Sequence, residues 1–299
     1  MLRVVFFGAN GDFSARAARA IASEHRIVAV VRADTRAPMG LGQRTHRALS
    51  ALARRVGLRP PRPLSGFAAE AGLMTWVARS RNDPRIPEVL ADLRPDMICI
   101  AGYPWLLPRE IYADLPLGAV NLHPSLLPRH RGVLPLFWIY HADDRETGVT
   151  VHRVTERADA GAVVAQEAFP LPRGFPVELL NQENAQRGAI LLCRAITAVG
   201  SGAAIVRAQD EARATLAPRI ELGRPMVDFV EWDVERVWHF LAGLSSHYRE
   251  PLHTADGATV RYREVAGYQR ETHASVPGAV SRRTGGWTLY CRGGTVQLC

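Results

Sequence analysis

Short apolar runs alternate with longer amphipathic segments through the first 120 residues. Residues 3–7 and 26–31 are continuous apolar runs typical of strands buried on both faces, and the Ala-rich segment 13–24 between them has helical spacing. Further strands are expected at 74–78, 97–101 and 118–122, and further helices near 44–56, 86–93 and 108–114. This succession predicts a doubly wound, Rossmann-like α/β sheet.

The pattern changes further along the chain. Two strand-like segments, 149–154 and 162–169, precede a helix expected at 176–199. From about residue 215, Gly and Pro separate short apolar runs. The elements expected there are a helix at 233–244 and strands at 258–265, 277–281, 286–291 and 294–298. The sequence thus predicts a large α/β domain over 1–205 and a small open β-barrel, similar to oligonucleotide-binding folds, over 215–299.

The composition suits two cores and a reducing compartment. With 299 residues and 47% hydrophobic content, the chain is long enough for one large and one smaller domain. The first apolar run ends at Gly8, too early for a signal peptide, and no other run is long enough to span a bilayer. No C-x-x-C pair or adjoining histidine set is formed by the four cysteines, Cys99, Cys193, Cys291 and Cys299. A cytoplasmic protein without a metal site is therefore expected.

Every basic residue of the chain is arginine. The 37 basic residues include no lysine, and the formal net charge is +8. The excess is greatest from Arg32 to Arg62, where eight arginines face one acid, Asp34. Such a density attracts a phosphate-bearing ligand, for which Arg44 and Arg47 are the candidate contacts. A solvated helix face explains the same pattern equally well.

The densest group of chemically active side chains follows the strand at 118–122. Asn121 and His123 stand two residues apart, so in an extended chain both side chains project to the same side. They lie at the carboxyl end of a predicted strand, where open α/β sheets bind ligands. Asp159 lies in a turn between two later strands, where a carboxylate can meet the imidazole and tune it for proton transfer. Each of these features taken alone is common at the end of a strand or in a turn and does not by itself indicate catalysis.

Three segments together resemble one known family. NLHPSLLPRHRG at 121–132, ETGVTVHRV at 146–154 and RADAGAVVAQ at 157–166 are similar to the folate-dependent formyltransferases. Members of that family act on methionyl-tRNA, glycinamide ribonucleotide or nucleotide sugars. The similarity is strong over about the first 200 residues and weaker after Arg219, where it extends to the small C-terminal barrel of the tRNA and amino-sugar members. It implies a Rossmann-like formyltransferase domain that uses 10-formyltetrahydrofolate as co-substrate and needs no metal.

The resemblance also assigns roles to residues. The catalytic positions fall on Asn121 and His123, which donate to an oxyanion, and on Asp159, which keeps His123 charged or correctly oriented. The folate pocket is expected in three loops, and the residues assigned to it are Ala101, Gly102, Tyr103, Trp105, Leu106, Ser125, Leu126, Leu127, Pro128, Ala158, Ala160 and Gly161. Arg131 and Gly132 are expected to close the site and to bind substrate.

Two functions of other classes explain parts of the pattern. The turn from Gly8 to Gly11 suggests a dinucleotide, but the third glycine of G-x-G-x-x-G is missing, which makes an NAD-dependent oxidoreductase a distant alternative. A noncatalytic nucleic-acid-binding protein would use the arginine-rich stretch and the barrel. Residues 211–299 carry 11 arginines against 10 acids, which argues against that function. His130, His141 and His152 lack metal-like spacing and are expected to be surface or structural residues.

The sequence is compatible with two classes of amine as the acceptor. A nucleotide-linked amino sugar, or a similar small amine, is favoured because Val133 to Trp138 replaces the Ala-Ala-Pro usual in tRNA enzymes. The segment around His152 and Asp159 also looks closest to the formyltransferase half of the polymyxin-resistance amino-sugar enzyme. Initiator methionyl-tRNA is the alternative, supported by the C-terminal domain and by room for a basic insertion after Asp34. No membrane partner is expected, and the oligomeric state is not indicated.

Overall fold

The computed structural model describes residues 1–34, 63–221 and 223–299, and its chain divides into two compact units. The first comprises residues 1–135, 147–169 and 181–217, and the second comprises residues 136–146, 170–180 and 218–299. Both units therefore contain segments that are distant in sequence. Arg44, Arg47 and the helix expected near 44–56 lie outside the described residues.

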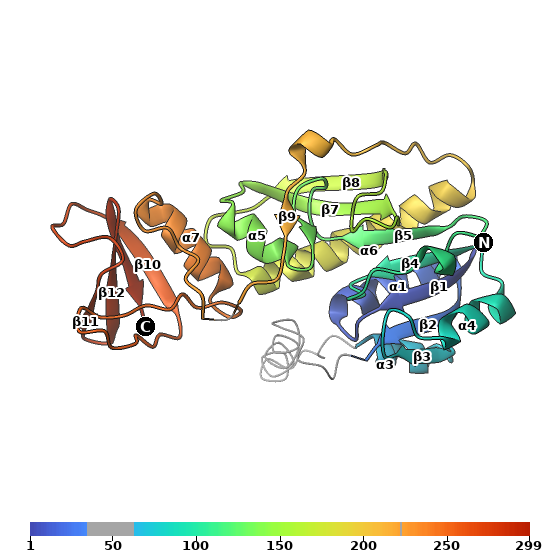
Figure 1. Ribbon diagram of the computed structural model, residues 1–299, viewed down its shortest axis with the longest axis horizontal. Helices are drawn as coiled ribbons and strands as arrows, with labels where there is room; N and C mark the ends of the chain where they lie inside the picture. The colour runs from blue at the N-terminus through green and yellow to red at the C-terminus, as the bar shows by residue number, and fades with distance from the viewer. Residues whose placement is uncertain (35–62, 222) are drawn as a thin grey trace. The chain divides into compact units, whose positions relative to one another are not determined.

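A seven-stranded sheet forms the centre of the α/β architecture (Figure 1). In spatial order its strands are β3 (Thr75–Ala78), β2 (Arg26–Ala33), β1 (Arg3–Gly8), β4 (Met97–Ala101), β5 (Ala119–His123), β7 (Glu146–Arg153) and β8 (Val163–Pro170). The strands from β3 to β5 pair in parallel, whereas β7 runs antiparallel to β5. The predicted doubly wound fold is confirmed.

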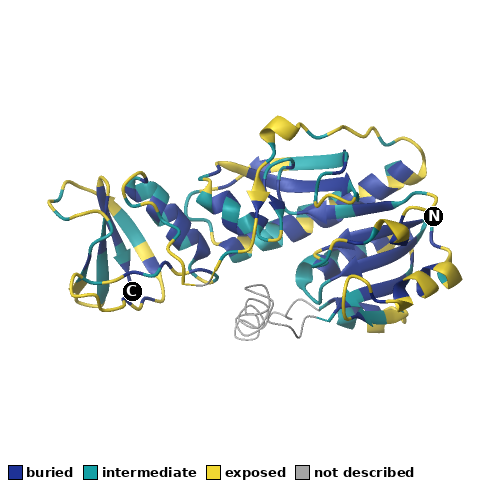
Figure 2. Ribbon diagram, in the orientation of Figure 1, coloured by how far each residue is buried: buried dark blue, intermediate teal, exposed yellow. Residues whose placement is uncertain are grey.

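Alternation along each strand divides the core into two layers, as expected for strands buried on both faces. Val4 and Phe6 of β1 join the first layer, with α1 (Asp12–Glu24), α3 (Leu64–Glu70) and α6 (Val177–Gly200). Val5 and Phe7 join the second layer, with α4 (Arg85–Leu93) and the 3-10 turn η1 (Arg109–Ile111). The central strands are accordingly the most deeply buried part of this unit (Figure 2).

Several element bounds differ from those the pattern predicts. The helix expected at 108–114 is only the single turn η1, because the segment carries little apolar periodicity beyond Ile111 and Tyr112. The helices α3 and α5 (Pro135–His141) and the two-residue strands β6 (Arg131–Gly132) and β9 (Leu216–Ala217) were not expected. Helices and strands this short have too little periodic sequence to be recognised.

The second unit contains a four-stranded antiparallel sheet and the helix α7 (Val234–Leu244). The strand order is β10 (Val265–Arg270), β13 (Gly294–Leu298), β12 (Gly286–Cys291) and β11 (Val280–Arg283). Asp233 caps the helix by accepting a hydrogen bond from the Arg236 N–H. The predicted strand at 258–265 is wrong, because only an isolated bridge between Thr259 and His253 forms there and the strand begins at Val265, whereas the small β-rich C-terminal region is confirmed.

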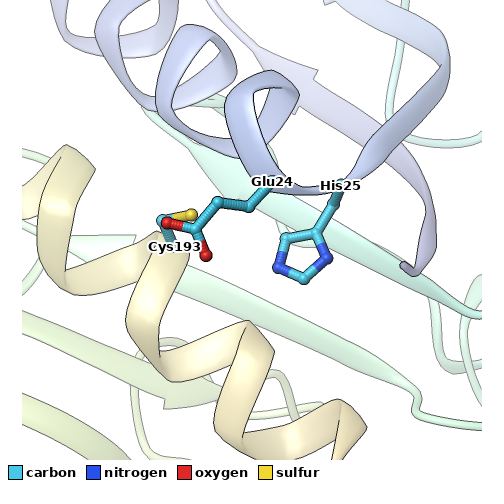
Figure 3. Close-up of side chains that lie close together, drawn as sticks. All are labelled: Glu24, His25 and Cys193. Atoms are coloured by element: carbon cyan, nitrogen blue, oxygen red, sulfur yellow. The ribbon is translucent and has the colours of Figure 1, made fainter.

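A cluster that the cysteine spacing did not suggest lies between the end of α1 and the side of α6. The side chains of Glu24, His25 and Cys193 place their oxygen, nitrogen and sulfur atoms within 4.8 Å of one another (Figure 3). His25 Nε2 lies 2.8 Å from Thr197 Oγ1, and the Cys193 thiol donates to the Ala20 carbonyl at 3.2 Å. These bonds link α1 to α6. Among the described residues, no helix combines the length and the apolar character required to cross a membrane.

Candidate active site

Strand β5 presents Asn121 and His123 to one face of the sheet. Val120 and Leu122 point into the layer that contains α6, so the alternating residues Asn121 and His123 point to the opposite side. His123 is buried, and its Nε2 lies 2.9 Å from the His130 carbonyl oxygen. Because a carbonyl only accepts, Nε2 carries the proton in the neutral imidazole and Nδ1 is free to accept one.

The turn between β7 and β8 folds back over this face and brings Asp159 to both residues. Asp159 Oδ1 accepts from Asn121 Nδ2 at 3.3 Å, and Oδ2 lies 3.6 Å from His123 Nδ1. The backbone N–H of Gly132 donates to Oδ2 at 2.9 Å. Asp159 adopts a positive φ of 51°, a conformation that non-glycine residues rarely adopt and that the surrounding contacts must hold. The expected trio therefore converges on one small volume.

A fourth polar residue, His152, completes the group. It lies opposite Asn121 in the β5–β7 ladder, and its ring is buried. His152 Nδ1 donates to the Arg153 carbonyl at 2.8 Å, which leaves Nε2 as an acceptor 3.1 Å from Asn121 Nδ2. The two donors of the Asn121 amide are thus directed to His152 and Asp159. His152 is structural, as expected, but it also orients a candidate catalytic side chain.

Opposing electrostatic effects act on the imidazole and the carboxylate. Burial lowers the pKa of His123 below its usual value, and the Asp159 charge only partly offsets this. Burial alone would raise the pKa of Asp159, but the nearby His123 and His152 rings and the hydrogen bond from the Gly132 N–H together hold it well below its usual range. At neutral pH the pair is therefore a neutral imidazole beside a carboxylate.

The loop after β5 is held by side chains of the neighbouring strands. Ser125 is fully buried and donates to the Arg129 carbonyl at 2.7 Å, and Leu127 precedes a cis peptide bond to Pro128. Thr150 Oγ1 donates to the Ser125 carbonyl at 2.6 Å and accepts from the Leu127 N–H at 3.2 Å. Gln166 Nε2 donates to the Leu127 carbonyl at 2.9 Å. These contacts place the segment from Ser125 to Pro128, with partly buried Leu126, beside His123.

The loop after β4 packs on the same face of the sheet as Asn121 and His123. Tyr103 and Trp105 join the layer that contains Ile100, and the Tyr103 ring makes edge-on contacts with Phe7 and Trp105. Ala101 ends β4 and is buried, while Gly102 has a φ of +68° that favours glycine. Leu106 is exposed. Tyr103 and Trp105 thus form an apolar surface in this loop, and the Leu106 side chain is accessible to solvent.

The Asp159 turn carries the last residues assigned to the folate pocket. Ala158 is exposed and Ala160 is half-buried, whereas Gly161 is buried. A Cβ on Gly161 would lie 1.8 Å from the Arg153 carbonyl oxygen, so only glycine fits there. The turn therefore depends on close backbone contact with the end of β7.

Arg131 and Gly132 lie beside the turn but use their polar groups within the protein. The Arg131 guanidinium is buried and donates to Gln209 Oε1 at 2.7 and 3.0 Å. It also forms a two-point ion pair with Glu211 at 2.8 and 3.1 Å, while the Gly132 N–H is bonded to Asp159. The Arg131 side chain therefore holds the site together.

Comparison with known families accounts for this arrangement. A family model described as formyl transferase matches residues 2–196. The chain belongs to the formyl transferase family. The methionyl-tRNA formyltransferase of Roseiflexus castenholzii is 33% identical over 229 residues, 76% of this chain and 68% of its own. That of Anaeromyxobacter sp. is 30% identical over 300 residues, 99% of this chain and 90% of its own.

Solved structures support the fold of this formyltransferase. The sugar 3N-formyl transferase WlaRD, solved in the presence of dTDP and 5-N-formyl-THF, matches with a TM-score of 0.70 and 13% identity over 100% of this chain and 97% of its own. An N-formyltransferase from Helicobacter canadensis, in complex with folinic acid and dTDP-3-aminofucose, matches with a TM-score of 0.72 and 13% sequence identity. The match covers 100% of this chain and 99% of the other. At such identities the likeness is one of fold.

Sequence reasoning missed Gln209, Glu211 and Thr150, which the formyltransferase uses to hold its loops. Thr150 and His152 alternate with buried valines in β7. Because alternate residues of a strand face one side, this pattern could have predicted two polar side chains on the same face. Gln209 and Glu211 lie in an irregular segment after α6, where no periodic pattern links them to Asp159. Only the folded chain brings them together.

Proposed function

We propose that this formyltransferase moves the formyl group of 10-formyltetrahydrofolate onto a primary amine at Asn121, His123 and Asp159. The observation that carries the proposal is their convergence, with Asp159 3.3 Å from Asn121 Nδ2 and 3.6 Å from His123 Nδ1. Formyl transfer needs donors and a proton acceptor around a single carbon, and this group supplies them without a covalent intermediate.

In the proposed reaction the amine nitrogen attacks the formyl carbon and a C–N bond forms. The carbonyl oxygen becomes an oxyanion, to which Asn121 Nδ2 donates once one of its N–H groups turns away from His152 or Asp159. The ammonium proton leaves to His123 Nδ1, directly or through a water held by Asp159. Collapse breaks the bond to the folate nitrogen, which takes up the proton that His123 accepted, and releases the formamide and tetrahydrofolate.

The folate binding assigned to the loop after β4 and to the Asp159 turn stays part of this proposal. Among the described residues, no backbone–backbone hydrogen bond involves residues 103–107, which supports polar contacts from this backbone to a pterin ring. The Tyr103 hydroxyl is buried and has no hydrogen-bond partner there. Such donors and acceptors beside an apolar wall suit a flat, polar-edged ring.

A nucleotide-linked amino sugar or a similar small amine is the proposed acceptor. The two sugar N-formyltransferase structures match this chain along its whole length, C-terminal region included. Arg44 and Arg47 are proposed to contact the acceptor phosphate. Initiator methionyl-tRNA is the second candidate, because the Anaeromyxobacter enzyme of that activity is 30% identical over 99% of this chain.

The test is a formyl-transfer assay with 10-formyltetrahydrofolate, offering charged initiator tRNA and a panel of nucleotide amino sugars side by side. Turnover with an amino sugar and none with the tRNA supports the proposed acceptor, and the reverse replaces it by the second candidate. Absence of transfer to every amine contradicts the proposed function. Replacing Arg44 and Arg47 by Ala should raise the KM of the acceptor and leave folate binding nearly unchanged.

A further inference from the structure

The segment after α6 crosses the loops that form the site. Residues 207–217, here called the strap, belong to the first unit and lead from the end of α6 towards β9 (Figure 1). They include the 3-10 turn η2 (Glu211–Arg213), and most of them are exposed (Figure 2). The family model ends at residue 196, so the strap lies outside the matched segment.

One end of the strap binds the loop after β5. The Arg131 N–H donates to the Thr215 carbonyl at 2.9 Å, and β6 pairs in parallel with β9. The His130 N–H donates to Thr215 Oγ1 at 2.9 Å. The N–H groups of Val133 and Leu134 both donate to the Ala217 carbonyl, at 3.0 and 3.1 Å. The loop that supplies the Gly132 N–H to Asp159 is thus bonded to the strap on both sides of Gly132.

The middle of the strap binds the Asp159 turn through Gln209. Its Nε2 donates to the carbonyl oxygens of Asp159 and Gly161, at 2.8 and 2.7 Å. Its Oε1 accepts both bonds from Arg131. The amide therefore uses both donors on the turn and its acceptor on the loop.

We propose that Gln209 is a positioning residue for formyl transfer, which holds the Asp159 carboxylate against His123 by bonding the backbone on either side of Ala160. This inference rests on the proposed function. Asp159 occupies the left-handed region, which few residues other than glycine adopt, so bonds to its carbonyl help to hold the turn in place. Glu211 supports the same bridge, because it pairs with Arg131 at 2.8 Å and with Arg157 at 3.0 Å.

Gln209→Met tests the role, because methionine has a similar length, carries no charge and makes no such hydrogen bonds. We expect kcat to fall by about 10- to 100-fold while the KM values for folate and amine change less than about threefold. Gln209→Glu keeps an acceptor for Arg131 but loses both donors, so it should lower kcat as well. Gln186→Met is the matched control, because Gln186 lies exposed on α6 in the same unit.

Two further measurements separate positioning from a general loss of structure. His123 faces Asp159, His152 and His130, and of these only Asp159 raises the His123 pKa by its charge. A displaced carboxylate should therefore move the acid limb of the kcat profile of Gln209→Met to lower pH. Hydrogen exchange of the backbone amides at 157–163 should become faster in both Gln209 variants and not in Gln186→Met.

The inference requires that kcat falls and that exchange in the turn increases. Wild-type kcat in both Gln209 variants overturns it, and so does a fall in kcat without faster exchange at 157–163. If the wild type transfers formyl to no amine, the proposed function fails, and the exchange measurement alone decides whether Gln209 fixes the turn. A drop in melting temperature shared with Gln186→Met would reveal an unspecific effect and likewise overturn the assignment.

Discussion

Replacing Asp159 by Asn removes one charge from the site while its shape is kept. The Asp159 carboxylate lies 3.6 Å from His123 Nδ1, and its side chain is only 15% exposed. At that distance and an effective dielectric constant of about 20, a full charge pair is worth about 5 kcal/mol, which sets an upper bound on the loss. The amide dipole retains part of the attraction, so we expect kcat to fall by about 10²- to 10³-fold, or roughly 3–4 kcal/mol.

The pH dependence of kcat tests the direction in which the pKa of His123 should change. Burial lowers the pKa of His123, and the Asp159 charge partly raises it again, so the variant should have a still lower pKa at His123. The rise of kcat with pH, which reports deprotonation of the base, should therefore begin at a lower pH in Asp159→Asn than in the wild type. Folate affinity should change much less than kcat, because the charge acts on the proton transfer.

Steady-state formyl transfer at saturating concentrations of both substrates, measured from pH 5 to 9, checks both parts. Asp114→Asn is the control, because Asp114 is exposed and the same change there should leave kcat and the profile unaltered. A variant with wild-type turnover would refute a role for the carboxylate. An acid limb displaced to higher pH would refute the coupling between Asp159 and His123.

Three further outcomes are expected. Asn121→Ala should lower kcat by roughly 10²-fold or more with little change in folate affinity, measured by steady-state kinetics and folate titration. Gly161→Ala should lower the melting temperature and the activity, because its Cβ would overlap a backbone carbonyl, whereas Gly11→Ala, whose Cβ meets open space, should lower neither. Burial lowers the pKa of His239 to about 3, so its contribution to stability is present above pH 6.5 and is lost as the pH falls towards 3. Urea unfolding of His239→Asn should thus depend on pH less steeply than that of the wild type, and equal slopes would contradict the shift.

Some parts of the fold follow from local sequence alone. The strands β1, β2, β4 and β5 appear within one or two residues of their predicted bounds, because each contains mainly apolar residues and is bounded by turn residues. The long helix α6 also matches closely. The strand β10 was misplaced, because Val260 and Tyr262 are buried in irregular backbone and apolar alternation does not distinguish such a segment from a paired strand.

The candidate site divides in the same way between local and distant information. Asn121 and His123 were predictable as neighbours, because the period of an extended chain places residues two apart on one side. Asp159 was expected nearby through the resemblance, but its contacts depend on a turn that folds back over the face of β5. The pairing of Asn121 with His152 depends on the register of two antiparallel strands.

The sequence by itself determined the α/β order of the first unit, the β-rich C-terminal region and the family, because these follow from periodicity and from short contiguous motifs. Tertiary structure alone decided that Arg131 points to Gln209 and Glu211, about 80 residues further along the chain, and that His123 is neutral beside a carboxylate. The physical reason is that side-chain partners and pKa values depend on burial and on distances between segments, and neither quantity is fixed by local sequence.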